Sequence, residues 1–166
     1  MNDRPKVIAL EGRLRHCRNV MTLGVRTNFS DYSPAEAALI RAAGKIYYPT
    51  DFYADLFDAM GKSTFPSYQT YRFVQDKIKQ TALFDLLGLP HPRTRVFYGR
   101  RQKDRIREFF RFPFIAKVPR GSAMGRGVFL IADDDDLQGY LQATHPAYIQ
   151  EYLPIDRDMR VVVIGR

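Results

Sequence analysis

The residues from Lys117 to Val128 combine chemical groups that could bind phosphate. Lys117 ends a short apolar run, and a loop from Pro119 to Gly127 with three glycines and one serine separates it from the next apolar run. Glycine lets backbone amides approach phosphate oxygens without obstruction by a Cβ, and the lysine supplies positive charge. The pattern suits a loop that covers a nucleotide, but the glycines taken alone favour a flexible hairpin turn.

Two familiar phosphate-binding loops do not match this spacing. A P-loop has its lysine directly after the last glycine, followed by serine or threonine, whereas Val128 follows Gly127 here. A protein kinase has its lysine downstream of the glycines, whereas Lys117 lies upstream of them. These two classes of nucleotide site are therefore excluded.

A second group of residues could contact a nucleoside. The run Ile149–Leu153 predicts a strand that continues into a short linker, and backbone groups of such a linker can pair with an adenine edge. Asp156 and Asp158 follow, and carboxylates accept hydrogen bonds from ribose hydroxyls. A solvated acidic turn explains the same cluster and is the commoner case.

A third signal is Lys77, which follows Asp76 at the start of a predicted helix. The helix dipole slightly disfavours a positive charge at this end, so a phosphate partner would explain why a lysine stands there. An ordinary surface lysine is the default explanation.

Caps and periodicity predict the elements that must position these residues. Ser33, Pro34 and Glu36 form a capping box with proline in the first helical turn, and Gly44 is expected to end that helix in the left-handed conformation. Thr50 is expected to cap the next helix. The predicted helices are 34–43, 51–60, 76–87, 101–110 and 134–144, and the predicted strands are 7–10, 46–48, 94–98, 114–118, 128–131, 147–151 and 159–164.

The helix 76–87 has the clearest pattern, because Gly88 and Pro90 predict its end and its apolar residues form one stripe. The stripe consists of Ile78, Ala82, Leu83, Leu86 and Leu87. The βαβα order before residue 66 favours a parallel sheet, which places the first part of the chain in the α/β class. From residue 90 onward, strands paired around a loop with helices between them predict an α+β sandwich.

Length and composition exclude several classes of protein. The 166 residues are 45% hydrophobic and 27% charged, which is typical of a folded chain. No apolar run is long enough to cross a bilayer or to form a signal peptide, which predicts a cytoplasmic protein. The single Cys17 excludes an internal disulfide, and the three scattered histidines lack the spacing of a metal site.

The net charge of +8 is concentrated in the middle of the chain. Residues 91–120 contain 10 basic and 2 acidic side chains, whose difference equals the charge of the whole chain. Such a block could bind nucleic acid or an acidic protein. Phe109 and Phe110, however, fall on the apolar stripe of the predicted helix 101–110 and are expected in the core. A solvated helix face is therefore favoured over nucleic-acid binding.

The order and spacing of these signals resemble the ATP-grasp superfamily, and within it the RimK-like branch, which contains ribosomal-protein glutamate ligases. The resemblance is in register over residues 66–166 and looser over 1–65. It is carried by Asp76-Lys77, Gly88-Leu89-Pro90, the strand 114–117, the loop Gly121-Ser122 to Gly125-Arg126-Gly127-Val128, the segment Gln150-Glu151-Tyr152-Leu153 and Asp158-Met159-Arg160. It implies a small parallel-sheet pre-ATP-grasp domain at 1–75, followed by the amino-terminal lobe of an ATP-grasp fold at 76–166.

The resemblance also implies a role for each matching residue. Lys77 and Lys117 match lysines that contact ATP phosphates. The phosphate-covering loop is matched by Gly121, Ser122, Gly125 and Gly127. The linker that pairs with adenine is matched by Glu151 and Tyr152, the acidic residue on the ribose by Asp158, and a basic position without an assigned role by Arg160. No residue is matched to a catalytic or metal-ligating position.

Members of this family join a carboxylate to an amine: ATP phosphorylates the carboxylate, and the amine attacks the acylphosphate. The resemblance therefore implies the ATP-binding part of a carboxylate–amine ligase, with ATP and Mg²⁺ as cofactors and with amino-acid or peptide substrates. The Mg²⁺ ligands are expected beyond Arg166, so we expect a truncated lobe that is inactive alone. The alternative is a non-catalytic basic module that binds nucleic acid or an acidic protein. Self-association is left open.

Overall fold

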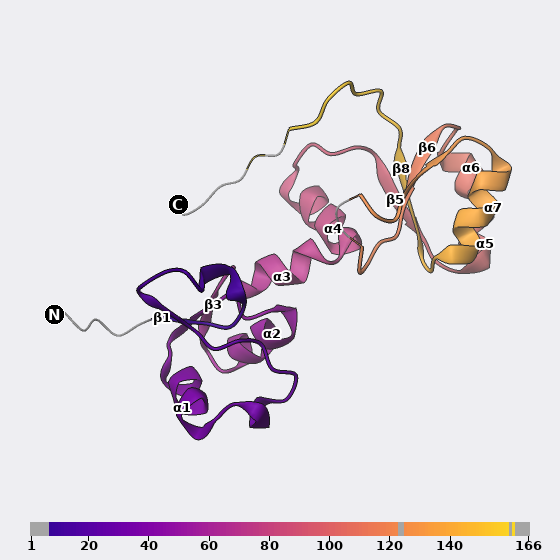
Figure 1. The fold of residues 1–166 in the computed structure, drawn as a ribbon. Helices are drawn as coiled ribbons and strands as arrows, with labels where there is room; N and C mark the ends of the chain where they lie inside the picture. The colour runs from indigo at the N-terminus through magenta and orange to yellow at the C-terminus, as the bar shows by residue number, and fades with distance from the viewer. Residues whose placement is uncertain (1–6, 123–124, 160, 162–166) are drawn as a thin grey trace. The chain divides into compact units, whose positions relative to one another are not determined.

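The computed structural model describes residues 7–122, 125–159 and 161 (Figure 1). The chain divides into two compact units, unit 1 at Met1–Gln75 and unit 2 at Asp76–Arg166. Each unit has its own hydrophobic core. Within the described residues, no helix has the length and apolar character needed to cross a membrane.

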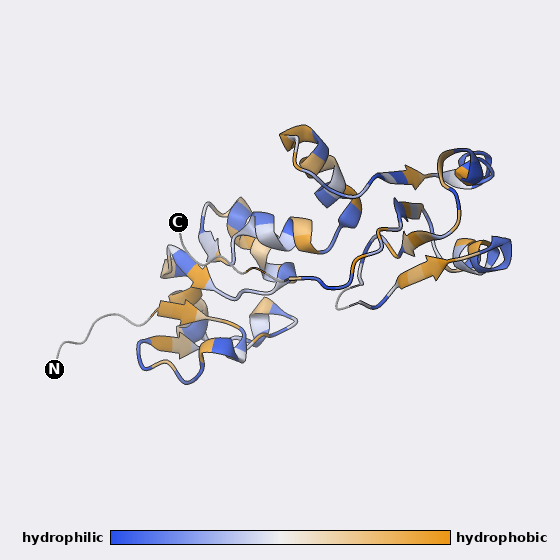
Figure 2. Cartoon of the chain, turned by 90° about the horizontal axis from the view of Figure 1, so that it is seen from above, coloured by the Kyte–Doolittle hydropathy of each residue, from blue (hydrophilic) through white to orange (hydrophobic). Residues whose placement is uncertain are grey.

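Unit 1 is built on a parallel sheet of four short strands, β1 (Val7–Ala9), β2 (Val20–Thr22), β3 (Lys45–Tyr47) and β4 (Ser63–Phe65). Their order is β2-β1-β3-β4, and the expected parallel pairing is confirmed. In Figure 2 the strands beside the N-terminal trace are orange, as the valine, isoleucine and alanine of β1 require. β2 and β4 are not among the strands predicted from the sequence.

Helix α1 (Pro34–Ala42) begins with the predicted capping box. The Ser33 hydroxyl accepts a hydrogen bond from the Glu36 amide at 3.3 Å, and the Glu36 carboxylate accepts one from the Ser33 amide at 2.8 Å. The predicted left-handed end at Gly44 is wrong: the cap Ala43 is extended, with φ −66° and ψ 125°, and Gly44 has no positive φ. The chain passes from this extended cap directly into β3, so it needs no left-handed turn.

Helix α2 (Asp51–Ala59) begins after Thr50, but the predicted cap by the threonine side chain is wrong. Thr50 has a φ of 74°, and its hydroxyl is buried without a hydrogen-bond partner among the described residues. A capping side chain needs an extended N-cap residue, which this conformation does not provide. Gly61 follows the helix with a φ of 72°, the left-handed conformation expected at that end.

The core of unit 1 lies between the sheet and the two helices α1 and α2. It contains Ile8, Leu10, Tyr32, Ala37, Ile40, Ile46, Tyr53 and Phe57. Because Ile8 and Ile46 are paired on neighbouring strands, they present the same face of the sheet to both helices. The remaining elements of the unit are the 3-10 turns η1 (Gly12–Leu14) and η2 (Phe29–Asp31) and the helix α3 (Tyr68–Val74).

Unit 2 contains an antiparallel sheet with the strand order β5-β8-β6-β7. The strands are β5 (Thr94–Phe97), β6 (Phe114–Lys117), β7 (Val128–Ile131) and β8 (Ala147–Glu151), each within one residue of its predicted bounds. Figure 1 shows α5, α6 and α7 on one side of this sheet and α4 on the other. The helices are α4 (Lys77–Leu87), α5 (Gly99–Lys103), α6 (Ile106–Phe109) and α7 (Asp134–Ala143). The predicted strand 159–164 lies mostly outside the described residues.

The predicted helix 101–110 is in fact two short helices, α5 and α6. The chain tightens between them, where the Arg105 amide bonds to the Gln102 carbonyl at 3.1 Å, three residues back. Phe110 is buried in the core as expected and Phe109 packs partly buried against it, but the basic Lys103 is buried as well. The Lys103 ammonium donates to the Thr144 carbonyl at 3.1 Å, after the C-terminus of α7. The basic block is therefore not entirely a solvated face.

Helix α4 ends at Leu87, as predicted, and the following Gly88 is left-handed with a φ of 63°. Its apolar stripe, however, does not enter the core of unit 2. None of its residues is buried, and Leu86 is 84% exposed. The core of unit 2 lies on the other face of the sheet, where α5, α6 and α7 pack, so this stripe has no core to fill.

Candidate functional site

One face of the unit 2 sheet carries polar side chains, and the other carries the core. Directly paired residues on antiparallel strands project to the same face, and Lys117 of β6 is paired with Tyr148 of β8. Gln150 lies two residues further along β8 and shares that face. The neighbours Ala116 and Ile149 are fully buried on the opposite face. The Tyr148 hydroxyl lies 2.6 Å from the Thr81 hydroxyl of α4, so the polar face is the one that α4 covers.

A chain of hydrogen bonds orients the Lys117 ammonium on this face. Lys117 Nζ donates to Gln150 Oε1 at 2.6 Å. The amide of that glutamine donates in turn to Thr94 Oγ1 at 2.9 Å. These contacts join β6, β8 and β5, so the position of the lysine is set by three strands of the sheet.

Lys77 reaches the same region from the first residue of α4. Its Nζ lies 2.9 Å from both the carbonyl and the hydroxyl oxygen of Ser122, in the glycine-rich loop. The Ser122 hydroxyl also donates to the Val118 carbonyl at 3.0 Å. The structure therefore brings a predicted lysine into contact with the predicted phosphate-covering loop.

Asp76 links the start of α4 to Arg120, near the start of the glycine-rich loop. Its carboxylate caps α4 by accepting hydrogen bonds from the amides of Ile78 and Lys79, at 3.0 and 3.2 Å. It also accepts a hydrogen bond from Arg120 Nε at 2.9 Å. Burial alone would raise the pKa of the Asp76 carboxyl, but the bonds from Arg120 and the two amides together hold that pKa below its usual range.

The loop between β6 and β7 needs its glycines. Gly121, Gly125 and Gly127 have φ values of 67°, 77° and 69°, a region that other residues rarely adopt. At Gly127 an added Cβ would lie 2.9 Å from the Val118 side chain. The Val118 amide donates to the Gly127 carbonyl at 2.7 Å, which closes the base of the loop. Residues 123 and 124 of the loop lie outside the described residues.

Among the described residues, no carboxylate accepts a hydrogen bond from the ammonium group of Lys77 or Lys117, so the two lysines form a positively charged site. Burial lowers the pKa of the Lys77 ammonium, although the Asp76 carboxylate partly opposes this effect. Burial also lowers the pKa of Lys117, and the positive charge of Lys77 lowers it further. The hydrogen-bond acceptors of both ammonium groups are neutral oxygens of Ser122 and Gln150. A bound anion would offset the repulsion and favour both charged forms.

Glu151 lies on the other face of the sheet from Lys117. It is paired with Phe114 at the end of β8, and its carboxylate accepts a hydrogen bond from the Arg93 amide at 2.6 Å. The Glu151 amide donates to the Arg93 carbonyl at 2.9 Å. Both groups of this residue are thus engaged with the chain that precedes β5.

Among the described residues, no hydrogen bond or ion pair joins Tyr152 or Asp158, the other residues assigned to nucleoside contacts, to either lysine. Tyr152 is 45% exposed at the start of an irregular segment after β8. Asp158 lies further along this segment, is exposed, and has no hydrogen bond or ion pair with a described residue. Arg160 lies outside the described residues.

Gln150 is a site residue that the sequence pattern does not single out. It precedes Glu151 in the same short run, and only the register of β8 against β6 shows which of the two faces Lys117. Asp76 and Arg120 are likewise joined across 44 residues of sequence. The alternation of side chains along a strand is the sequence signal that places Gln150 and Glu151 on opposite faces of the sheet.

The described residues do not offer a metal site. Among them, no three His, Cys, Asp or Glu side chains gather in a way that could hold a metal ion. Aspartate or glutamate oxygens are the ligands that Mg²⁺ prefers, and the acceptors found beside the two lysines are a serine and a glutamine instead. These residues fit an anion and not a cation.

Comparison with known proteins places this geometry in a family. The model of the RimK-like ATP-grasp domain matches residues 74–166. No curated protein matches the sequence. Among solved structures, the chain is similar to a RimK domain ATP-grasp protein from Sphaerobacter thermophilus, with a TM-score of 0.64 and 18% identity over 91% of this chain and 65% of that one.

Two further structures share the fold. The N5-carboxyaminoimidazole ribonucleotide synthetase from Thermus thermophilus has a TM-score of 0.63 and 17% identity, over 90% of this chain and 41% of that one. The N5-carboxyaminoimidazole synthetase from Staphylococcus aureus, complexed with ADP, has a TM-score of 0.64 and 20% identity, again over 90% and 41%. The chain thus spans less than two thirds of the length of each of these three structures.

The family match extends over more than half of the chain and includes α4, the glycine-rich loop and all four strands of the unit 2 sheet. The expected α/β and antiparallel architecture is confirmed, with ATP-grasp structures aligned over about nine tenths of the chain. The resemblance drawn from the ordered motifs is confirmed as well. The chain belongs to the RimK-like ATP-grasp domain family.

Proposed function

We propose that unit 2 binds the phosphates of ATP, as part of an ATP-dependent carboxylate–amine ligase. The observation that carries this proposal is the pair of partly buried lysines that donate to neutral oxygens, where burial and the charge of Lys77 lower the pKa of Lys117. Charge-assisted hydrogen bonds to phosphate are the interactions for which such a pair is suited. The Staphylococcus aureus structure that shares the fold is a complex with ADP, which supports a nucleotide as the anion.

The chain's own residues have distinct parts in this proposal. Lys77 and Lys117 neutralise phosphate charge, which is the main contribution of a protein to phosphoryl transfer. The backbone amides around Gly121, Ser122, Gly125 and Gly127 cover the phosphates, because glycine leaves them accessible. A phosphate that enters would replace Ser122 and Gln150 as acceptors of the two ammonium groups.

The nucleoside contacts are proposed for the end of β8 and the segment that follows it. The backbone of Glu151 and Tyr152 would pair with adenine, and Asp158 would accept hydrogen bonds from the ribose. Because the Glu151 amide is already bonded to Arg93, its carbonyl and the groups of Tyr152 are the ones left for the base. Arg160 is proposed as a further basic contact.

The reaction proposed for the whole protein joins a carboxylate to an amine through an acylphosphate, and glutamate is the proposed amine of this branch. Unit 1 would correspond to the pre-ATP-grasp domain and unit 2 to the amino-terminal lobe. The Mg²⁺ expected for such chemistry would take its ligands from outside the described residues. We expect this chain alone to have no ligase turnover, and ATP hydrolysis coupled to an amide product would contradict that expectation.

Nucleotide binding by Lys117→Ala tests the phosphate site. Loss of a charge-assisted hydrogen bond should raise the Kd for ATP about tenfold or more, measured by calorimetry. Lys79→Ala is the matched control, since this lysine stands on the same helix and its side chain makes no hydrogen bond or ion pair with the described residues. Unchanged affinity in Lys117→Ala, or an equal loss in Lys79→Ala, would count against the proposal.

The alternative of a nucleic-acid-binding module has less support from the same unit. Two phenylalanine rings beside the basic block are covered by the chain's own arginines: the Arg95 guanidinium lies 3.7 Å from the centre of the Phe109 ring, and that of Arg107 lies 3.4 Å from the Phe112 ring. Rings covered in this way are not free to stack on bases. The arrangement favours a self-contained arginine–phenylalanine surface.

A further inference from the structure

Unit 1 has an apolar hollow of about 480 Å³ that the phosphate site does not explain. Its floor is formed by the core residues Ile40, Tyr53 and Phe57. Its rim is formed by Phe52, Leu56 and Ala59 of α2 with the following Met60, by Thr27 and by Phe29 of η2, and by Arg41 of α1. Phe52 is 61% exposed and Met60 is 57% exposed, so large apolar side chains border an open concave site.

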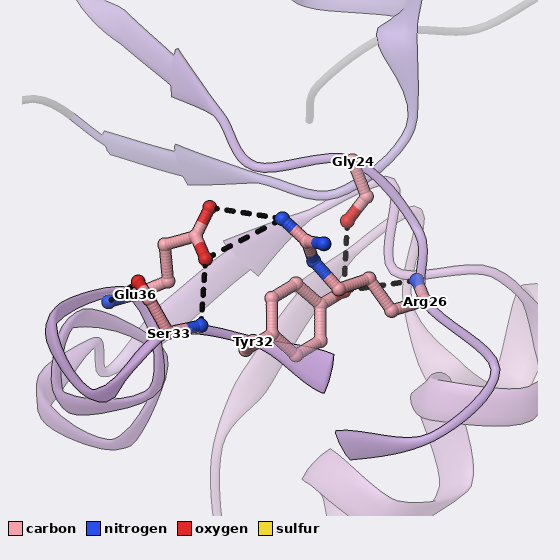
Figure 3. Close-up of polar contacts among 5 residues, drawn as sticks. All are labelled: Gly24, Arg26, Tyr32, Ser33 and Glu36. Carbon is pink, nitrogen blue, oxygen red and sulfur yellow. Dashed lines mark hydrogen bonds and ion pairs between the residues drawn. The ribbon is translucent and has the colours of Figure 1, made fainter. Parts of the chain in front are cut away.

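The loop wall of this hollow is fixed in place by a polar cluster, shown in Figure 3. Arg26 Nη2 lies 3.3 Å from Glu36 Oε1, and the Tyr32 hydroxyl donates to the Gly24 carbonyl at 2.7 Å. The Tyr53 hydroxyl donates to the Arg26 carbonyl, also at 2.7 Å, and so binds the loop to α2. The segment that leads to Thr27 and Phe29 is therefore held before any ligand arrives.

Arg41 is the one charged side chain among the residues that line the hollow. Its guanidinium lies 5.2 Å from the centre of the Phe29 ring, and no carboxylate of a described residue forms an ion pair with it. The aspartates of α2 line neighbouring hollows instead: Asp51 and Asp55 one, and Asp58 another. The hollow thus offers an apolar surface with a single positive charge at its edge.

We propose that this hollow binds a small amphipathic monocarboxylate, with its apolar body against α2 and its carboxylate on Arg41. The volume falls within the range of small-molecule sites, which are mostly apolar with a few polar groups that fix orientation. Arginine recognises carboxylates through paired N–H donors, which explains a guanidinium beside an otherwise apolar lining. A second copy of the chain is the competing occupant, because exposed apolar patches also mark protein interfaces.

Binding of decanoate to the full chain tests this inference. We expect saturable binding by calorimetry below the concentration at which decanoate forms micelles. Arg41→Gln should weaken decanoate binding about tenfold, as expected for loss of a charge-assisted hydrogen bond. The same variant should leave binding of the uncharged decanol unchanged. Arg18→Gln, an exposed arginine of unit 1 outside the lining, is the matched control and should behave as the unmodified chain.

Three results would overturn the inference. The first is the absence of saturable decanoate binding. The second is an equal loss of decanoate and decanol binding in Arg41→Gln, because the guanidinium would then not act through its charge. The third is a dimer, seen by sedimentation, that Leu56→Glu dissociates, because a second copy would then cover the hollow. ATP binding through Lys117 is measured independently, so either proposal can fail without the other.

Discussion

Each unit holds a cluster of positive side chains, and the two clusters have different partners. In unit 1 the Arg26 guanidinium is paired with the Glu36 carboxylate, inside a cluster that also contains the cap of α1 (Figure 3). In unit 2 the ammonium groups of Lys77 and Lys117 face neutral oxygens and repel each other. A charge with an opposing partner stabilises the fold, whereas a charge beside a like charge raises the free energy of the folded protein until an anion binds. Of these two clusters, the one in unit 2 is distinguished as the proposed ligand site by the like charge beside Lys117.

A glycine substitution in each unit should give the largest difference. Gly127→Ala should lower the free energy of unfolding by about 2 kcal/mol or more, because residue 127 has a φ of 69° and the new Cβ would meet Val118 at 2.9 Å. Gly44→Ala in unit 1 is the control, since Gly44 has no positive φ and a Cβ added there would meet no described atom within 4 Å. Chemical denaturation measures both.

Gly44→Ala should be neutral or slightly stabilising, by up to about 1 kcal/mol, because alanine restricts the unfolded chain. If the two alanine variants lose equal stability, the loop of unit 2 is not held in the glycine-specific conformation. The base of the proposed phosphate-covering loop would then be adaptable.

Asp76→Ala should have a smaller effect, a loss of about 1 to 2 kcal/mol, because it removes the cap of α4 and the partner of Arg120. The pKa of Asp76 is lower in the folded protein than in the unfolded chain. Its contribution to stability is therefore present above the unfolded pKa and is lost as the pH falls through the folded pKa. Asp76→Ala should flatten the acid limb of the stability curve, and an unchanged acid limb would contradict this assignment.

Lys117→Met should have the smallest effect and the opposite sign. The pKa of Lys117 is lowered in the folded protein, so its charge opposes folding at neutral pH, and this penalty is relieved as the pH rises through the folded pKa towards the unfolded one. We expect a gain of about 0.5 kcal/mol in the absence of nucleotide, measured by denaturation. A clear loss of stability would show that the bond to Gln150 outweighs the repulsion, and the contrast between the units would weaken.

The local signals in the sequence predict most of the elements that carry the site. The strands of unit 2 match within one residue, because apolar runs bounded by glycine, proline or aspartate determine them. The capping box at Ser33 is confirmed for the same reason, since all of its atoms lie within four residues. Motif order was sufficient to indicate the family, which the match over residues 74–166 confirms.

The parts that the sequence could not predict depend on register and on long-range packing. Gln150 and Glu151 are neighbours, and only the pairing of β8 with β6 shows that the glutamine faces Lys117. Thr50 has the residue type of a helix cap, but its backbone conformation prevents it from acting as one. The apolar stripe of α4 has the pattern of a buried face, although none of its residues is buried. Periodicity reports which residues share a face and not what covers that face.

The hydrogen bonds of the two lysines also affect how tightly an anion can be bound. Lys77 and Lys117 are held by Ser122 and Gln150 before any ligand is present, so their side chains have already lost much of their rotational freedom on folding. Immobilising a flexible side chain on binding costs about 0.5 to 1.5 kcal/mol. For these two residues the entropic cost is already included in the free energy of folding. When a phosphate binds, each ammonium group replaces an oxygen of Ser122 or Gln150 with a phosphate oxygen.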